Sequence, residues 1–336
     1  MKQYLKKLIS GQDLDENMMQ EIFEGIIAGS VDPIMAGGIL TALAAKGETE
    51  NEIRGVVKTM RKHMKIIQAN AGMAGVVLDT CGTGGDGART INVSTLAALL
   101  CAAAGVKVAK HGNRSVSSKC GSFDVLEELG VKIDLEPKRS LACLNEIGIA
   151  CLFAPMYHPA MKNIAPIRKA LGIRTVFNLI GPALNPASAN CQLIGVCDLP
   201  TAEKLGRICL SLGSKKVLLA HSRDGLDEIS ASAPTDIYEF NIGHKMKKYT
   251  VEPESQCSLD ELKGDDSRAN AKILSEILQG RGTDAQNEFV ALNVAGGLVA
   301  AGVYDDFALA KKRAHELLES GAGFAKLQEL VKYTNQ

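Results

Sequence analysis

A glycine-rich turn is the first segment of the sequence that could do chemistry. The run Gly82-Thr83-Gly84-Gly85-Asp86-Gly87 follows the apolar residues 76–78. Glycines let consecutive backbone N–H groups face an anion, because no Cβ atom blocks the approach. Ser94, the predicted cap of a helix, and Thr95 follow at that helix's start, where N–H groups and the helix dipole favour phosphate. These features predict a phosphate cradle; the alternative is a tight turn followed by an ordinary helix cap.

The same run matches the pattern Gly-x-Gly-x-x-Gly, which by itself is a weak signal for a dinucleotide-binding fold. In that fold the glycines open the helix directly, whereas residues 88–93 intervene here. The fold also expects an acidic residue about 20 residues later, at the end of the second strand. Here the second predicted strand ends in Lys110-His111-Gly112-Asn113-Arg114, a basic cluster that suits phosphate better than a ribose diol. A P-loop is disfavoured too, because no Gly-Lys-Ser/Thr follows the glycines.

An acidic loop is the second candidate. The predicted strand 217–221 runs into Ser222-Arg223-Asp224-Gly225-Leu226-Asp227-Glu228, and its clustered carboxylates repel one another unless a cation lies among them. Mg²⁺ takes carboxylate oxygens together with substrate phosphates. Asp227 and Glu228 are therefore the predicted metal ligands. The alternative is a solvated acidic loop.

The third candidate is His158, within the segment 153–162, together with Arg168. An arginine beside apolar residues recognises a planar carboxylate through a bidentate fork. Read alone, the two residues are better explained as a helix-capping histidine and a surface arginine.

Composition limits the classes of function. The chain has 336 residues, enough for about two domains, and 38 basic residues balance 38 acidic ones. Zero net charge, 4% aromatic residues and no Trp disfavour nucleic-acid and membrane partners. The nine cysteines include no C-x-x-C pair, and no stretch resembles a signal peptide or a membrane span, so we expect a cytoplasmic protein.

Residues 1–65 are predicted to be helical throughout. Asp13 with Glu16, and Thr49 with Glu52, have the spacing of capping boxes, and Asp32-Pro33 has the pattern of a cap followed by a first-turn proline.

Beyond residue 75, strands alternate with helices, which indicates a mainly parallel sheet covered on both faces. The predicted strands are 76–79, 106–109, 131–135, 149–153, 192–196 and 215–221, with a hairpin at 237–251. The expected fold is a small N-terminal helical domain, residues 1–72 with 159–184 packing back onto it, plus a larger α/β domain, residues 73–158 and 185–336.

The complete set of motifs resembles the anthranilate phosphoribosyltransferase family, within the class that is similar to nucleoside phosphorylases. The matching segments are Asp79–Gly87, Asn92–Thr95, Lys110–Arg114, Ser117–Lys119, Phe153–Lys162, Arg174–Pro182 and Asp224–Glu228. They occur in the family's order and cover nearly the whole chain.

The resemblance implies transfer of a phosphoribosyl group from phosphoribosyl pyrophosphate to the amine of anthranilate, with release of pyrophosphate, in tryptophan biosynthesis. It implies a Mg²⁺ cofactor and a homodimer formed through the helical domain. Residues implied to bind the substrates, mainly the phosphoribosyl donor, are Gly82, Gly84, Gly85, Asp86, Thr90, Asn92, Ser94, Thr95, Lys110 and Ser122. Residues implied to line the route and site for anthranilate are His111, Asn113, His158, Arg168 and Gly181. Ser94, Asp227 and Glu228 are the implied ligands of Mg²⁺, and positioning falls to Arg168 and Asn113.

Three positions depart from the family's usual pattern. Cys120 and Phe123 stand where small residues such as Ser and Ala are expected, and Ser222 replaces a glycine. The rival hypotheses are a pyrimidine nucleoside phosphorylase, a non-catalytic relative that binds phosphate-rich ligands or nucleic acid, and a dehydrogenase.

Overall fold

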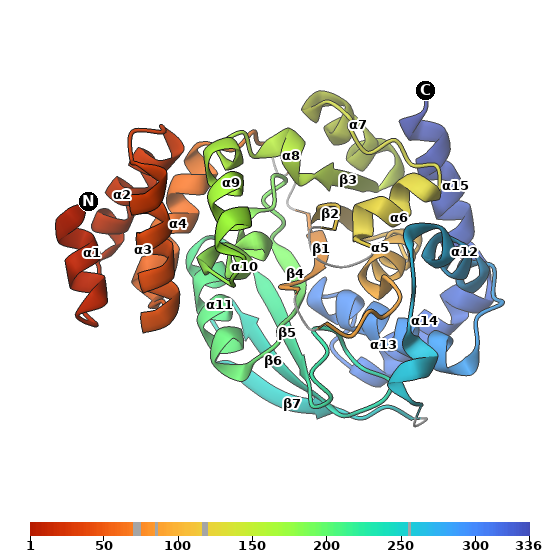
Figure 1. The fold of residues 1–336 in the computed structure, drawn as a ribbon. Helices are drawn as coiled ribbons and strands as arrows, with labels where there is room; N and C mark the ends of the chain where they lie inside the picture. The colour runs from red at the N-terminus through yellow and green to blue at the C-terminus, as the bar shows by residue number, and fades with distance from the viewer. Residues whose placement is uncertain (70–74, 85–86, 116–119, 255–256) are drawn as a thin grey trace. The chain divides into compact units, whose positions relative to one another are not determined.

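The computed structural model describes residues 1–69, 75–84, 87–115, 120–254 and 257–336. The chain forms two compact units (Figure 1). One comprises Met1–Lys65 and Pro155–Leu184, and the other comprises Ile66–Ala154 and Asn185–Gln336.

The first unit consists of helices, as predicted for residues 1–65. Its elements are α1 (Lys2–Ile9), α2 (Glu16–Ile27), α3 (Pro33–Lys46), α4 (Glu50–Lys62), α9 (Met161–Leu171), α10 (Val176–Leu179) and the 3-10 helix η1 (Gly181–Leu184). The short helix α8 (Ala154–Tyr157) precedes α9. Helix α9 packs against α2 and α3, and the Phe177 ring lies 5.7 Å from that of Phe23.

Of the three helix caps predicted within residues 1–65, two are confirmed and one is wrong. Thr49 and Glu52 form a reciprocal capping box, and Asp32 accepts the N–H of Ile34 at 2.9 Å. Helix α2 is capped by Asp15, whose carboxylate accepts the N–H of Met18 at 2.8 Å. Asp13 instead forms an ion pair with Lys46 at 2.7 Å. The cap of α2 therefore lies two residues after the predicted position, because this segment contains more than one acidic residue that can cap a helix.

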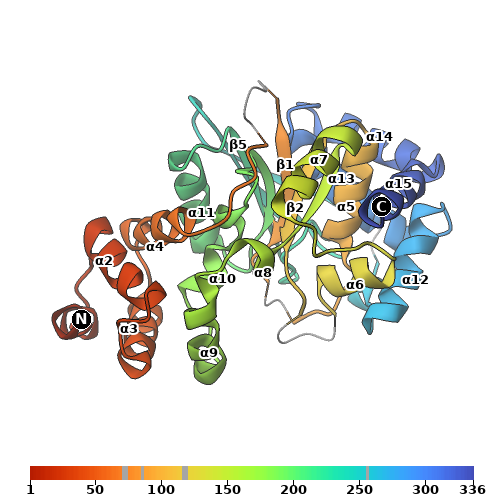
Figure 2. The same cartoon turned by 90° about the horizontal axis from the view of Figure 1, so that it is seen from above.

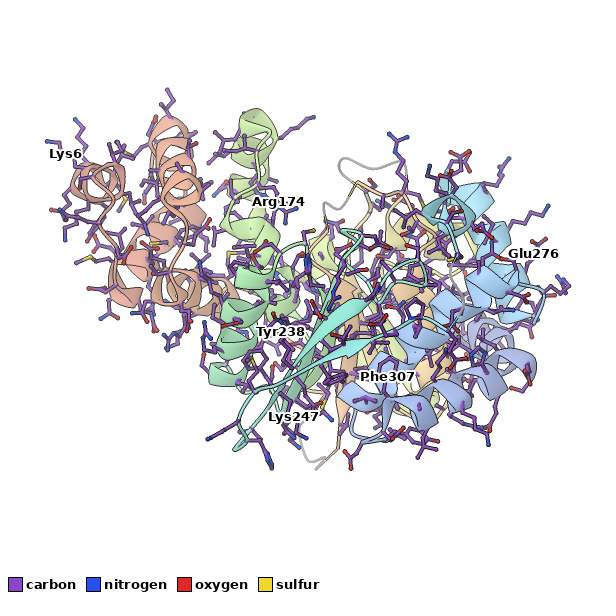
Figure 3. All side chains as sticks on the ribbon, turned by 90° about the horizontal axis from the view of Figure 1, so that it is seen from below. Lys6, Arg174, Tyr238, Lys247, Glu276 and Phe307 are labelled. Carbon is purple, nitrogen blue, oxygen red and sulfur yellow. The ribbon has the colours of Figure 1, made fainter. Side chains whose placement is uncertain are left out.

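The second unit is built on a seven-stranded sheet with the order β3-β2-β1-β4-β5-β6-β7. The strands are β1 (Val77–Gly82), β2 (Lys107–Gly112), β3 (Ile149–Phe153), β4 (Cys191–Gly195), β5 (Lys216–Ser222), β6 (Thr235–Asn241) and β7 (Lys247–Val251). Strands β1 to β5 pair in parallel, while β6 and β7 add an antiparallel hairpin, marked in Figure 3 by Tyr238 and Lys247. The predicted fold class, a helical domain with a larger α/β domain, is confirmed.

Helices flank the sheet. They are α5 (Val93–Ala103), α6 (Ser122–Glu128), α7 (Pro137–Ile147), α11 (Leu199–Ser211), η2 (Leu259–Leu262), α12 (Ser267–Leu278), α13 (Asp284–Ala300), α14 (Phe307–Glu319) and α15 (Ala322–Thr334). Helices α13, α14 and α15 gather with α5 on one side of the sheet (Figure 2). Among helices of the described residues, none has the length and apolar character needed to cross a membrane.

The predicted strand 131–135 is wrong, because this segment does not join the sheet. Its side chains do alternate between buried and exposed, as the sequence pattern indicated. However, the N–H of Lys132 donates to the Thr334 hydroxyl at 3.2 Å, and that of Val131 donates to the carbonyl of Leu126. The buried side chains of this segment therefore pack near the end of α15. Among the described residues the segment pairs with no strand.

The chain reverses its direction across the sheet between β1 and β4. From β1 it proceeds to β2 and β3 on one side, and then returns to β4 on the other side of β1. In open α/β sheets, ligands bind outside the carboxyl ends of the strands at such a point. The glycine turn follows β1 directly and therefore lies at this position.

Candidate active site

The glycine turn and the acidic loop meet at the carboxyl edge of the sheet. The Asp227 carboxylate oxygen Oδ2 accepts the backbone N–H of Gly84 at 2.6 Å. Asp227 is buried although it belongs to the loop that follows β5. Two motifs that are distant in sequence thus form one local structure.

Two glycines make room for Asp227. Gly82 and Gly195 are register partners at the ends of the adjacent strands β1 and β4. A Cβ atom on Gly82 would overlap the Asp227 carboxylate, and one on Gly195 would overlap its backbone carbonyl. Glycine is therefore required at both positions by close approach rather than by backbone conformation.

The acidic loop uses one of its carboxylates for its own structure. Asp224 accepts the hydroxyls of Ser230, at 2.6 Å, and Ser232, and the N–H of Leu226 at 3.2 Å. Burial acts to raise the pKa of Asp224, but these hydrogen bonds outweigh it and lower that pKa overall. Asp224 thus holds the loop together, which leaves Asp227 and the half-buried Glu228 as candidate metal ligands.

This donor set fits Mg²⁺. No group of three or more His, Cys, Asp or Glu side chains suitable for a metal occurs in the described part of the chain. Mg²⁺ does not require such a cage, because it usually binds one or two carboxylates, substrate phosphates and water. The oxygen atoms of Asp227 and Glu228, beside the predicted phosphate cradle, have that character.

Lys110 is buried at the centre of the predicted phosphate site. Its ammonium group donates to the carbonyl of Thr80 at 3.0 Å and to the Ser94 hydroxyl at 3.2 Å. Strands β1 and β2 and helix α5 therefore converge on one positive charge. Lys110 and Ser94, both implied by the sequence to bind the donor, are in direct contact.

The buried carboxylate of Asp79 stabilises the basic end of β2. Asp79 accepts the side-chain amide of Asn185 at 2.8 Å and the backbone N–H of His111 at 3.2 Å. Burial raises the pKa of Asp79 to about 6, although Asn185, the Lys110 charge and the His111 N–H oppose this rise. Asp79 thereby fixes the backbone where Lys110 and His111 leave β2.

Two buried hydroxyls near the turn have no hydrogen-bond partner among the residues that the structure describes. They are Oγ1 of Thr83, in the turn itself, and Oγ1 of Thr95, in the first turn of α5. Buried polar atoms are nearly always paired, so an unpaired one is a feature that a polar ligand explains. Both hydroxyls suit the oxygens of a phosphate.

Of the remaining residues implied to bind the donor, Thr90 and Asn92 precede α5. Helix α5 begins at Val93 with Asn92 as its N-cap, so the prediction that Ser94 caps this helix is wrong. Thr90 pairs with Lys263 in an isolated bridge. Gly85 and Asp86, implied to hold the donor, and Ser117-Ser118-Lys119 lie outside the described residues.

Three residues implied for anthranilate lie in the helical unit. The guanidinium of Arg168 stacks over the Phe177 ring at 5.3 Å, and burial lowers the pKa of Arg168. Burial also lowers the pKa of His158 to about 4, which leaves its imidazole neutral near pH 7. Gly181 opens η1, whose Ala183 carbonyl accepts the Arg61 guanidinium at 2.8 Å.

Comparison with known proteins decides the family. A family model described as "Glycosyl transferase family, a/b domain" matches residues 74–324, and one described as "Glycosyl transferase family, helical bundle domain" matches residues 2–64. The anthranilate phosphoribosyltransferase of Desulfatibacillum aliphaticivorans is 46% identical over 99% of this chain and 98% of its own length. That of Clostridium kluyveri is 41% identical over 98% of each. The chain belongs to the anthranilate phosphoribosyltransferase family.

Solved structures of anthranilate phosphoribosyltransferases have the same fold. The enzyme from Thermus thermophilus matches with a TM-score of 0.91 and 36% identity over 99% of each chain. The enzyme from Saccharomyces cerevisiae in complex with PRPP and Mg matches with a TM-score of 0.89 and 25% identity, over 99% of this chain and 97% of its own.

Two of the residues that depart from the anthranilate phosphoribosyltransferase pattern, Phe123 and Cys120, are accommodated by local contacts. Phe123 is buried and stacks on Phe153 at 5.5 Å, and Arg114 lies over the Phe153 ring at 4.9 Å. A Cβ atom on Gly112 would meet both Phe123 and the Ser122 hydroxyl, so Ser122 lies against the end of β2. The Cys120 thiol donates to the Asn92 side chain at 3.5 Å.

Sequence reasoning assigned no role at this anthranilate phosphoribosyltransferase site to Thr83, Asn185 or Asn270. Thr83 lies inside the glycine motif, so the motif itself was an available signal. Asn185 lies 106 residues from Asp79, and Asn270 lies 178 residues from Asn92. No local pattern marks such distant pairs.

Proposed function

We propose that the residues at the carboxyl edge of the sheet bind phosphoribosyl pyrophosphate and that His158, Arg168 and Gly181 bind anthranilate. The family's reaction joins C1 of the ribose to the anthranilate amine and releases pyrophosphate. The proposal assigns to residues of this chain the tasks that this reaction sets.

The first task is to stabilise negative charge on the departing pyrophosphate. The buried Lys110 ammonium and the hydroxyls of Thr83 and Thr95 are donors already held in place. Preorganised donors of this kind stabilise developing charge at little reorganisation cost. Asp227 and Glu228, with Ser94, would hold Mg²⁺, which neutralises phosphate charge when bound.

The second task is to hold anthranilate by its carboxylate and aim its amine. Arg168 offers a planar fork for the carboxylate, and its stacking on Phe177 limits the freedom of the guanidinium. The neutral imidazole of His158 adds a polar group without adding a charge. His111 and Asn113, at the end of β2, complete the proposed anthranilate residues. Positioning, rather than a covalent nucleophile, meets the needs of this reaction.

The observation that carries the proposal is the hydrogen bond from Gly84 to Asp227, because it joins the anion cradle to the metal ligands. The test follows anthranilate fluorescence in the purified protein. We expect the signal to fall only when phosphoribosyl pyrophosphate and Mg²⁺ are both present. An unchanged signal at high enzyme concentration would overturn the proposal.

The assembly, domain division and compartment belong to the same proposal. We expect a homodimer formed through the helical unit, where the apolar side chains of Ile9 and Ile34 are 71% and 86% exposed. Light scattering of wild type and of Ile34→Glu tests this.

We place the domain boundaries at residues 72, 159 and 184, near the division between the compact units, and limited proteolysis tests them. The nine free cysteines suit the cytoplasm.

A further inference from the structure

Asn92 occupies the N-cap of α5 but does not cap it. Asparagine is favoured at this position because its side-chain oxygen accepts an N–H group of the first turn. Here that side chain makes no such hydrogen bond. Its oxygen Oδ1 instead accepts Asn270 Nδ2 at 3.1 Å and the Cys120 thiol at 3.5 Å.

A backbone group sets the orientation of this network. The N–H of Asp265 donates to Asn270 Oδ1 at 2.8 Å. A backbone N–H can only donate, so the Asn270 carboxamide must turn its oxygen toward Asp265 and its Nδ2 toward Asn92. Asn92 must then present its own oxygen to Asn270. The Asn92 Nδ2 group, with its two N–H donors, therefore points away from Asn270.

The backbone beside Asn92 is held by the same distant segment. The N–H of Ile91 donates to the Leu262 carbonyl, and that of Gly264 donates to the Arg89 carbonyl, both at 2.9 Å. Arg89 has a φ of 57°, a left-handed conformation that is costly for a residue other than glycine. Such a conformation persists only where the surrounding structure enforces it, so this segment shapes the approach to Asn92.

Asn270 is built into its place. It is buried near the start of α12, the helix that carries the labelled Glu276 in Figure 3. A Cβ atom on Gly264 would overlap its carboxamide. The side chain therefore lies against the backbone, where substitution of its neighbour would displace it.

We propose that Asn270 is a positioning residue that orients Asn92 so that Nδ2 donates to a phosphate oxygen of the phosphoribosyl donor. This inference rests on the proposed role of Asn92 in donor binding. Asn270 acts through Asn92 and touches no reacting atom itself. Two N–H donors match the acceptor oxygens of pyrophosphate, whereas an amide oxygen presented there would repel them.

The test is Asn270→Asp, which keeps the shape of the side chain and the acceptor for the Asp265 N–H. Its second carboxylate oxygen would face the Asn92 oxygen and force the Asn92 amide to turn round. We expect about a tenfold or larger rise in the dissociation constant for phosphoribosyl pyrophosphate with Mg²⁺, measured by calorimetric titration. The KM for anthranilate should remain within about twofold of the wild-type value, because the substitution changes the contacts of the other substrate alone.

Asn287→Asp is the matched control. Asn287 also lies near the start of a C-terminal helix, α13, and packs against a preceding glycine, Gly282. Its amide donates to the Gly282 carbonyl at 3.1 Å. We expect wild-type affinity for the donor in this variant. A merely structural effect of the new charge would appear in both variants.

Asn92→Ala separates the failure of this inference from the failure of its premise. Wild-type donor affinity in Asn92→Ala would remove Asn92 from the donor site and overturn both. Weakened binding in Asn92→Ala with unchanged binding in folded Asn270→Asp would overturn the orienting role alone. If Asn270→Asp does not fold, Gly264→Ala decides: weakened donor binding supports the role, and unchanged binding overturns it.

Discussion

The Asp227 carboxylate accepts the backbone N–H of Gly84 at 2.6 Å, although 143 residues separate the two in sequence. The contact exists because β4 lies between β1 and β5, so the segments following β1 and β5 emerge at the same edge of the sheet. The proposed phosphate cradle and the proposed metal ligands thereby share one location. This proximity supports the assignment of both segments to one site.

Replacing Asp227 by Asn should abolish the response to magnesium. The change removes one carboxylate oxygen from the proposed ligand set, so we expect activity to fall at least about 100-fold, the scale of removing one preorganised electrostatic group. Asp224→Asn is the control, because Asp224 bonds to serines in the same loop. It should lower the melting temperature and leave the half-saturating magnesium concentration unchanged. Equal magnesium responses in both variants would exclude Asp227 as a ligand.

Lys110→Met should weaken binding of the donor and of pyrophosphate. Methionine keeps the apolar stem but removes the ammonium that lies beside Ser94, and a lost charge-assisted hydrogen bond corresponds to about 10- to 100-fold in affinity. The measurement is the inhibition constant of pyrophosphate. Lys107→Met, at the start of the same strand, should change it by less than about twofold, the usual size of a surface effect. A wild-type inhibition constant in Lys110→Met would contradict the assignment.

Arg168→Ala should weaken anthranilate far more than the donor. Loss of a bidentate fork to a carboxylate corresponds to about 10- to 100-fold, which we expect in the KM for anthranilate. The neighbouring Lys169 is exposed, so Lys169→Ala serves as the control. An equal rise in KM for both substrates would assign Arg168 to structure, through its stacking on Phe177.

Thr95→Val should separate stability from function. The buried Thr95 hydroxyl has no partner in the described part of the chain, so its removal should stabilise the ligand-free protein, by about 1 kcal/mol, and weaken donor binding. Thr80→Val is the control, because the Thr80 hydroxyl donates to the Ser94 carbonyl at 2.9 Å and its loss should destabilise the protein. Denaturant unfolding with and without phosphoribosyl pyrophosphate measures both effects. Destabilisation by both substitutions would show that the Thr95 hydroxyl is paired within the protein.

His158 should make the protein sensitive to acid. Burial lowers its pKa from 6.5 to about 4, so the unfolded chain binds a proton at a higher pH than the folded chain does. The folded state therefore keeps its full free energy of unfolding above about pH 6.5. As the pH falls towards 4, protonation of His158 in the unfolded chain lowers that free energy by roughly 3 kcal/mol at most. His158→Gln should flatten the free energy of unfolding across this window, whereas His244→Gln, at an exposed turn residue, should not. A wild-type slope in His158→Gln would exclude this origin.

The sequence predicted the elements whose signals are local. Thr49 with Glu52, and Asp32 with Pro33, mark helix starts through contacts within one turn, and both caps are confirmed. Apolar runs between glycine-ended helices located the strands. The failures were local patterns that tertiary contacts reassigned. Residues 131–135 have a strand's alternation but bond to Leu126 and Thr334 instead, and Asp15 capped α2 in place of Asp13.

What the sequence alone determined is the chemistry available to this protein: the glycines that expose N–H groups, the basic end of β2 and the paired carboxylates after β5. Only the tertiary structure decided which of these meet. Strand order brings Asp227 to Gly84, and the C-terminal segment brings Asn270 to Asn92, across 143 and 178 residues respectively. Local propensity acts over a few residues, whereas such pairings depend on how the whole sheet and its helices pack. For that reason the motifs indicated a phosphate site, and the fold showed how its parts are oriented.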